Sequence, residues 1–170
     1  MKKKIIIIAS IVLLLSAFAV LADSIDFFGL LDIQGKVGPL AHKVMDTIDQ
    51  SADADGRCVI AINELTDFDW DTMVAAGWLS PLKEIKELPK GVRERNGIWS
   101  YLIFLKDGKV VYREAYRASV ETSYKFNLNI PGESHRIFTP DNALIAGRRF
   151  VSPKYSPNDP NAPYFYALVF

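Results

Sequence analysis

The sequence has few of the residues that build disulfide and metal frameworks. Its 170 residues include one cysteine, Cys58, and two histidines, His42 and His135. A single cysteine excludes an internal disulfide, and its place in an apolar run predicts a buried, slowly reacting thiol. The histidines are far apart and show neither H-E-x-x-H nor C-x-x-C spacing, which argues against a zinc site. We therefore expect no metal and no cofactor.

Charge of one sign and nucleotide-binding motifs are also absent. Lysine plus arginine number 20, and aspartate plus glutamate also number 20. Without a basic excess the sequence gives no indication of nucleic-acid binding. It contains neither G-x-x-x-x-G-K-[ST] nor G-x-G-x-x-G. The stretch "GESHR" at 132–136 lacks the second glycine of a nucleophile elbow. No catalytic or cofactor-binding residue can be assigned from these patterns.

The N-terminus, in contrast, has a recognisable pattern. Three lysines at 2–4 precede an uncharged apolar run at 5–22. A basic segment, an apolar segment and small residues such as Ala17 and Ala19 make a secretory signal. The run is also long enough to cross a bilayer as a helix. We predict that residues 1–22 are either a cleaved signal peptide or a membrane anchor. Both place residues 23–170 outside the cytoplasm, secreted, in the periplasm or anchored to the inner membrane.

Residues 23–170 are predicted to form a single α+β domain. We expect one mostly antiparallel sheet of about five strands, one long amphipathic helix and one or two short helices. The long helix is indicated by apolar spacing over 37–48, with Gly38 as cap and Pro39 at the first position. Short helices are expected in "DWDTMVAAG" and "SPLKEIKELP", and "TPDNALIAG" at 139–147 is ambiguous.

Strand patterns account for most of the remaining sequence. An apolar, β-branched run at 57–65 predicts a central strand buried on both faces. Two strand-like runs meet at Asp107-Gly108, a pair favoured in tight hairpin turns. Residues 122–130 are expected as a third strand beside that hairpin, and 164–170 as a final strand.

The stretch "LTDFDWD", Leu65–Asp71, is the most suggestive cluster of acidic residues. Asp67, Asp69 and Asp71, with Glu64 just before them, could supply the paired carboxylates of a hydrolase. The alternative is an architectural corner, in which Asp69 caps a helix beginning at Trp70 and the aromatic side chains anchor the chain. We favour the corner.

A second acidic stretch, "DQSADADGR", resembles a calcium-binding loop. Asp53 and Asp55 precede Gly56, but a loop numbered from Ser51 has Ile62 where an acidic twelfth ligand is required. An acidic solvated turn is the better interpretation.

A family resemblance covers Arg57–Tyr116. A strand ending at Leu65-Thr66, an F-x-W-D segment at 68–71 and the hairpin "YLIFLKDGKVV" are similar to a group of small uncharacterised bacterial envelope proteins and lipoproteins. Those proteins also place a cysteine at the strand start, as Cys58 is here. The chain departs from them after Asp71, where they continue with an apolar aromatic stretch and proline. The resemblance implies an envelope location and adds no catalytic residue.

These observations lead to one functional prediction and one alternative. We predict a non-enzymatic binding module, such as an inhibitor or an immunity protein, with a protein partner in the envelope and membrane contact only through residues 5–22. The alternative is a small envelope hydrolase that uses a carboxylate site near Glu64–Asp71.

Overall fold

The computed structural model describes residues 38–92, 99–117, 125–130, 134–151, 159 and 162–170. The predicted signal or anchor at 1–22 lies outside these residues, as do residues 23–37. Within the described part of the chain, no helix is both long and apolar enough to cross a membrane.

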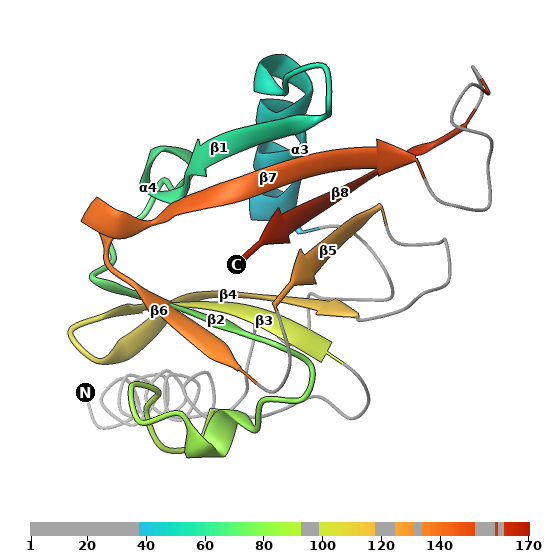
Figure 1. Ribbon diagram of the computed structural model, residues 1–170. Coiled ribbons are helices and arrows are strands. Elements are labelled where there is room, and N and C mark those ends of the chain that lie inside the picture. Colours follow the sequence, from blue (N-terminus) through green and yellow to red (C-terminus); the bar gives the residue numbers. More distant parts are fainter. Residues whose placement is uncertain (1–37, 93–98, 118–124, 131–133, 152–158, 160–161) are drawn as a thin grey trace, which may run out of the picture. The chain divides into compact units, whose positions relative to one another are not determined.

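The described residues fold mainly into β-structure, in two four-stranded sheets (Figure 1). The first sheet has the order β1 (Arg57–Ala61), β7 (Leu144–Val151), β8 (Tyr164–Val169) and β5 (Phe126–Asn129). The second has the order β4 (Lys109–Arg117), β3 (Trp99–Lys106), β2 (Thr72–Ala76) and β6 (His135–Phe138). The predicted α+β fold with one sheet of about five strands is therefore wrong.

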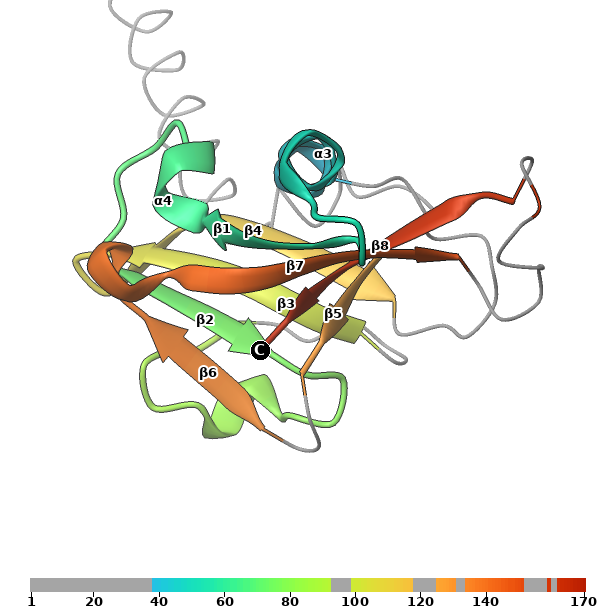
Figure 2. The same ribbon diagram turned by 45° about the horizontal axis from the view of Figure 1, so that its top comes forward.

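The predicted amphipathic helix is present as α3 (Pro39–Ser51). The other α-helix among the described residues is α4 (Ile62–Leu65), which is a single turn. Figures 1 and 2 show α3 beside β1 and β7, against which it packs. Its buried residues follow the predicted spacing: Leu40, Ala41, Val44 and Ile48. Gly147 permits this close approach, because a Cβ there would lie 2.6 Å from Ile60 Cδ1 and 3.0 Å from Ile48 Cγ1.

The hairpin at Asp107-Gly108 is confirmed. β3 and β4 pair antiparallel, and the two turn residues have φ values of 51° and 72°. Positive φ at both positions is the requirement of the type I′ turn that this dipeptide predicts.

The helix expected in "DWDTMVAAG" is instead strand β2. It pairs with β3 on one side and β6 on the other, and residues Met73–Ala76 are all buried. Alanine-rich sequence favours a helix when taken alone. Here two flanking strands bond both edges of the segment, and tertiary context overrides the local preference.

The helix expected in "SPLKEIKELP" is a series of tight turns that contains the 3₁₀ turn η1 (Leu82–Glu84). Backbone bonds join Glu84 N–H to Pro81 O and Leu88 N–H to Ile85 O, each spanning three residues. Leu82, Ile85 and Leu88 consequently share one face with a period of three. They cover the side of the second sheet that carries Val74, Ala76, Tyr101, Ile103 and Leu105.

The opposite side of the second sheet packs against α3 and the first sheet to form the larger core. Its buried members include Phe104, Met73 and Leu102 from the second sheet, with Ile60 and Leu168 from the first. Strand β5, expected beside the hairpin, instead pairs parallel with the final strand β8. The ambiguous 139–147 segment forms the 3₁₀ turn η2 (Pro140–Asn142), capped by Thr139, and then enters β7.

Candidate functional site

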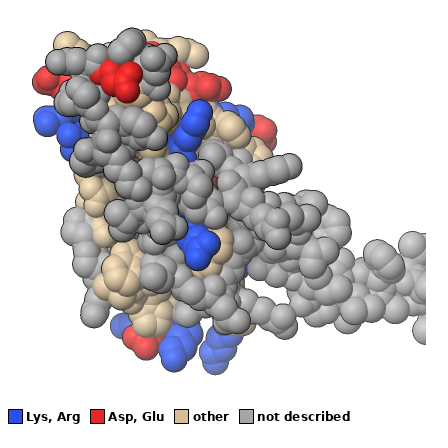
Figure 3. Space-filling view, turned by 90° about the vertical axis from the view of Figure 1, so that its right-hand side faces the viewer, with Lys and Arg blue, Asp and Glu red and all other residues tan. Residues whose placement is uncertain are grey.

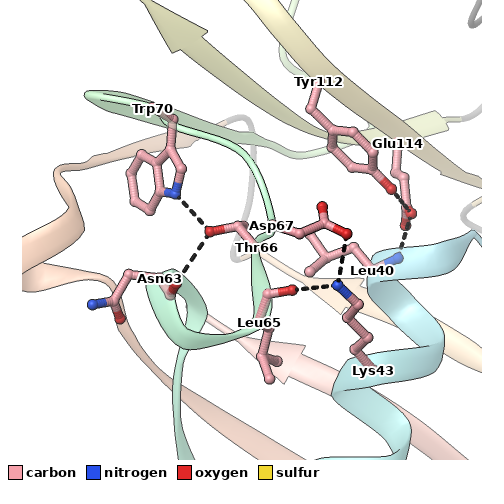
Figure 4. A network of polar contacts seen from close by, with 9 residues as sticks. All are labelled: Leu40, Lys43, Asn63, Leu65, Thr66, Asp67, Trp70, Tyr112 and Glu114. Carbon is pink, nitrogen blue, oxygen red and sulfur yellow. Dashed lines mark hydrogen bonds and ion pairs between the residues drawn. The ribbon is translucent and has the colours of Figure 1, made fainter.

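The corner "LTDFDWD" is anchored by its aromatic side chains. Trp70 is buried and meets Phe104 edge-on at 5.2 Å between ring centroids. Phe68 stacks on Tyr112 at 4.7 Å and meets Phe104 edge-on at 5.3 Å. Trp70 Nε1 donates to Thr66 Oγ1 at 3.0 Å, and Thr66 Oγ1 donates to Asn63 O at 3.1 Å (Figure 4). The aromatic part of the predicted corner is therefore present.

The helix-capping part of that prediction is wrong. Strand β1 ends at Ala61 rather than near Leu65, and the chain after Trp70 enters strand β2. Asp69 is exposed and precedes no helix. The turn α4 occupies the residues that were expected to complete the strand.

The acidic residues of the corner have different surroundings. Asp67 pairs with Lys43 of α3 at 3.4 Å, and the same ammonium donates to Leu65 O at 3.0 Å (Figure 4). Asp71 Oδ2 accepts the Asp107 N–H at 2.7 Å, so it supports the hairpin turn. Glu64 and Asp69 are exposed. Asp67 and Asp71 thus bond to different parts of the structure, and the hydrolase site near Glu64–Asp71 stays a prediction.

Asp71 provides a prediction about acid stability. The backbone hydrogen bond from Asp107 holds the pKa of Asp71 below its usual 3.8. A carboxyl with a lowered folded pKa stabilises the fold above its unfolded pKa, and this is lost as pH falls through the folded pKa. Asp71→Asn should therefore lower the free energy of unfolding at about pH 7 and make it fall less on acidification below about pH 4.

Urea unfolding at several pH values measures this effect. Asp69→Asn is the matched control, because Asp69 is exposed and two positions away. Equal pH profiles for the two variants would show that the bond to the hairpin turn contributes nothing.

A buried carboxylate that the sequence analysis missed lies at the start of α3. Glu114 is 8% exposed. Its Oε1 accepts Leu40 N–H at 2.7 Å and the Tyr112 hydroxyl (Figure 4). Its Oε2 accepts Ala41 N–H at 3.3 Å and the Tyr116 hydroxyl. A carboxylate has about four acceptor positions, so all of them are filled. Glu114 caps the helix and has no free position for a ligand.

Two sequence signals could have indicated this cluster. Tyr112, Glu114 and Tyr116 alternate along β4 and so share one face of the strand. Gly38 precedes α3 but has no side chain with which to cap it.

Burial, with the hydrogen bond to Glu114, raises the pKa of Tyr112 well above its usual 10.0. Tyr112 therefore acts as a proton donor in the bond to Glu114 and not as a base.

A second polar cluster ties the end of α3 to the first sheet. Asp49 accepts Arg149 Nη1 at 2.9 Å and the Tyr166 hydroxyl at 2.8 Å. Burial, with the hydrogen bond to Asp49, raises the pKa of Tyr166 to about 12. Arg149 also lies 4.6 Å over the Tyr164 ring. These contacts join α3, β7 and β8, and the polar groups of Asp49, Arg149 and Tyr166 bond to one another.

The other candidate ligands do not assemble. Asp53 Oδ1 accepts the backbone N–H groups of Asp55 and Arg57, both at 2.9 Å, which is an Asx turn. His42 is exposed on α3, whereas His135 begins β6. In the part of the chain that the structure describes, no three histidine, cysteine or acidic residues are grouped to hold a metal. Cys58, expected to be buried, is only partly buried, with Sγ 3.9 Å from Gly147 O.

The most unusual surface is the side of β1 and β7 that faces away from α3. Strand β1 was expected to be central and buried on both faces, but it is an edge strand. Val59 is 69% exposed and Leu144 is 63% exposed. The strand register places Val59 opposite Ala146, and Ala146 opposite Val169 of β8. We call Val59, Leu144 and Ala146 the outer apolar patch.

Two arginines border this patch. Arg57 and Arg148 are exposed and directly opposite each other on β1 and β7. The guanidinium of Arg148 lies 5.8 Å over the Phe150 ring. Among the described residues, neither arginine is paired with an acidic side chain. Adjacent like charges on one sheet face are unfavourable unless an anionic group neutralises them.

No protein-family model matches the chain, and no curated protein or solved structure is significantly similar to it. The resemblance to the envelope group therefore stays a prediction. The functional argument depends on the surface and the contacts described above.

Proposed function

We propose that the chain is a non-enzymatic interaction module of the bacterial envelope that binds a protein partner through the outer apolar patch. The observation that carries this proposal is the exposure of Val59 and Leu144 on adjacent strands. Isolated exposed apolar residues need no explanation. Val59 and Leu144 instead lie on one sheet face, and Ala146 joins them because it is opposite Val59 on β1 and two positions from Leu144 on β7.

The surface also indicates the character of the partner. Burying an exposed valine or leucine side chain contributes about 1.5–3 kcal/mol, so the patch can supply the centre of an interface. Arg57 and Arg148 would lie at its rim, where a carboxylate of the partner relieves their mutual repulsion. The partner surface that best complements the outer apolar patch is therefore apolar at its centre and acidic at its border. An inhibitor or immunity protein that binds a toxin has this mode of action.

The patch is also suited to binding because its backbone is held in place. The free edge of β1 is shortened by the Asp53 turn, whose carboxylate bonds to Arg57 N–H. The turn occupies the backbone N–H and C=O of Arg57 at that edge, and edge strands in soluble proteins are commonly blunted in such ways. We therefore favour recognition through the side chains of the sheet face over strand addition.

The test is substitution of the patch with a matched control. Val59→Glu and Leu144→Glu should each weaken capture of the partner from envelope extracts by about tenfold or more, because a carboxylate would be buried among apolar groups and beside any acidic rim. Val110→Glu is the control, since Val110 is 38% exposed on the other sheet. Urea unfolding should show all three variants folded.

Photo-crosslinking groups placed at positions 59, 144 and 110 provide the direct readout in cells. Adducts with the same protein from positions 59 and 144, and none from 110, are expected. Equal capture by the wild type and both patch variants would reject the proposal. So would repeated failure to obtain any adduct from position 59.

A further inference from the structure

The chain leaving β2 presents two large apolar side chains at the tip of a turn. Ser80 N–H donates to Gly77 O at 3.0 Å, which closes a β-turn with Trp78 and Leu79 at its two central positions. Trp78 is 47% exposed and Leu79 is 43% exposed. Turn tips usually carry glycine, proline, asparagine, aspartate or serine. A tryptophan followed by a leucine there exposes apolar area that the fold itself does not use.

The turn is held firmly on both sides. Gly77 is buried, and its N–H donates to Ser134 O at 3.4 Å. Ser80 is buried, and Leu82 just after it is almost fully buried under the second sheet. The residues around the tip are thus fixed in the core, while Trp78 and Leu79 project from it.

The charges around the tip differ from those at the other end of the domain. Lys83, Lys86 and Lys90 follow it and are exposed, with Glu84 and Glu87 between them, which leaves an excess of one positive charge. In Figure 3 basic side chains predominate at the bottom, the end at which Figure 1 shows η1. Acidic side chains gather at the top, near the turn between α3 and β1.

We propose that Trp78 and Leu79 insert into the interfacial region of a lipid bilayer. Tryptophan favours this region because its ring is largely apolar and its N–H remains hydrogen-bonded at headgroup level. Lysine stems can lie along apolar surface while their ammonium groups reach lipid phosphates. Because the charge excess is small, the apolar side chains supply most of the attraction.

The length of the preceding chain favours a membrane over a soluble partner. If residues 5–22 remain as the predicted anchor, residues 23–38 connect the bilayer to α3. A segment of this length reaches at most about 55 Å when fully extended. The domain would then always be near lipid, and weak insertion of two side chains would be sufficient to orient it. This contact is additional to residues 5–22, and it involves a different sheet from the outer apolar patch.

The test uses the full chain with vesicles of phosphatidylethanolamine and phosphatidylglycerol whose acyl chains are brominated, because bromine quenches tryptophan fluorescence on contact. The three tryptophans include Trp70, which is buried, and Trp99, which is partly buried. Subtracting the signal of Trp78→Phe therefore isolates Trp78. We expect quenching of the Trp78 component at least about twice that of the remaining tryptophans, since only Trp78 reaches the lipid.

Leu79→Glu keeps the fluorophore but places a carboxylate at the tip, and should abolish most of that quenching. Val110→Glu, a comparable substitution on β4, should leave it unchanged. Equal quenching in the wild type and Trp78→Phe, with the protein bound to vesicles, would overturn the proposal. A blue-shifted Trp78 emission without bromine quenching would also overturn it, since it would indicate a protein contact at the tip.

Discussion

Replacing Glu114 with alanine is expected to lower the free energy of unfolding by about 3–5 kcal/mol, because each buried donor left without an acceptor costs about 1–3 kcal/mol. The donors are the N–H groups of Leu40 and Ala41 and the hydroxyls of Tyr112 and Tyr116. The loss is less than the sum over four donors because Tyr112 is only partly buried and can reach water. Urea unfolding followed by circular dichroism measures the change.

Glu114→Gln is the matched variant, because it keeps the shape and one acceptor oxygen. It should cost clearly less than Glu114→Ala, since the tyrosine hydroxyls can accept from the new amide. Similar losses for both variants would show that the charge, rather than the number of acceptors, is what matters.

Gly38 gives an independent check on the same contact. A Cβ at position 38 would lie 2.3 Å from Glu114 Cδ, so Gly38→Ala should destabilise the wild type strongly. In the Glu114→Ala background the space is free, and Gly38→Ser should restore part of the lost stability by capping α3 in the ordinary way. If Gly38→Ala lowers stability equally in the wild type and in the Glu114→Ala background, the effects are additive, which would contradict this coupling.

Replacing Trp70 with alanine is the second change with a large expected effect. Trp70 is buried and packs against Phe104, which is fully buried in the larger core. Truncating a tryptophan in a core costs about 3–5 kcal/mol, and the loss of the Nε1 bond to Thr66 adds to it. We expect the midpoint of urea unfolding to fall markedly with little change in slope.

Asp69→Ala is the control for this substitution. Asp69 is exposed and neighbours Trp70 in the chain, so its replacement should change stability by less than about 0.5 kcal/mol. A larger effect from Asp69→Ala than from Trp70→Ala would mean that the corner is not anchored by its aromatic residues. Loss of partner binding by Asp69→Ala at full stability would instead make the corner a binding site.

The sequence predicted local elements best where one short pattern specifies one geometry. The spacing of Leu40, Val44 and Ile48 predicted α3, and Asp107-Gly108 predicted the hairpin. The aromatic pair Phe68 and Trp70 indicated an anchored corner. The helix and the turn depend on residues a few positions apart, so the pattern contains the needed information. For the corner, the sequence indicated only that large aromatic side chains would be buried, since their packing partners Phe104 and Tyr112 lie far along the chain.

The failed predictions concern segments whose partners are distant in sequence. "TMVAA" could form a helix alone, but β3 and β6 provide partners for both of its edges. "KEIKEL" has an apolar spacing of three residues that fits tight turns as well as part of a helix. Secondary-structure propensity differs by less than about 1 kcal/mol for such residues, which packing against a sheet easily exceeds.

The candidate surfaces depended on the tertiary structure in the same way. Val59 in an apolar run predicted burial, and only the order of the first sheet made β1 an edge strand and left Val59 exposed. Glu114 was an ordinary charged residue in sequence, and only the packing of β4 against the start of α3 made it a buried cap. Trp78 and Leu79 likewise became a tip through the turn closed by Ser80.

The sequence by itself determined the composition, the predicted export signal, the amphipathic face of α3 and the turn between β3 and β4. These properties arise from single residues or from contacts a few positions apart. The tertiary structure alone decided that there are two sheets, which strand edges and faces remain exposed, and which carboxylate is buried. Those features depend on the pairing of strands such as β5 with β8 and β1 with β7, which are separated by many residues, and no local pattern specifies such pairings.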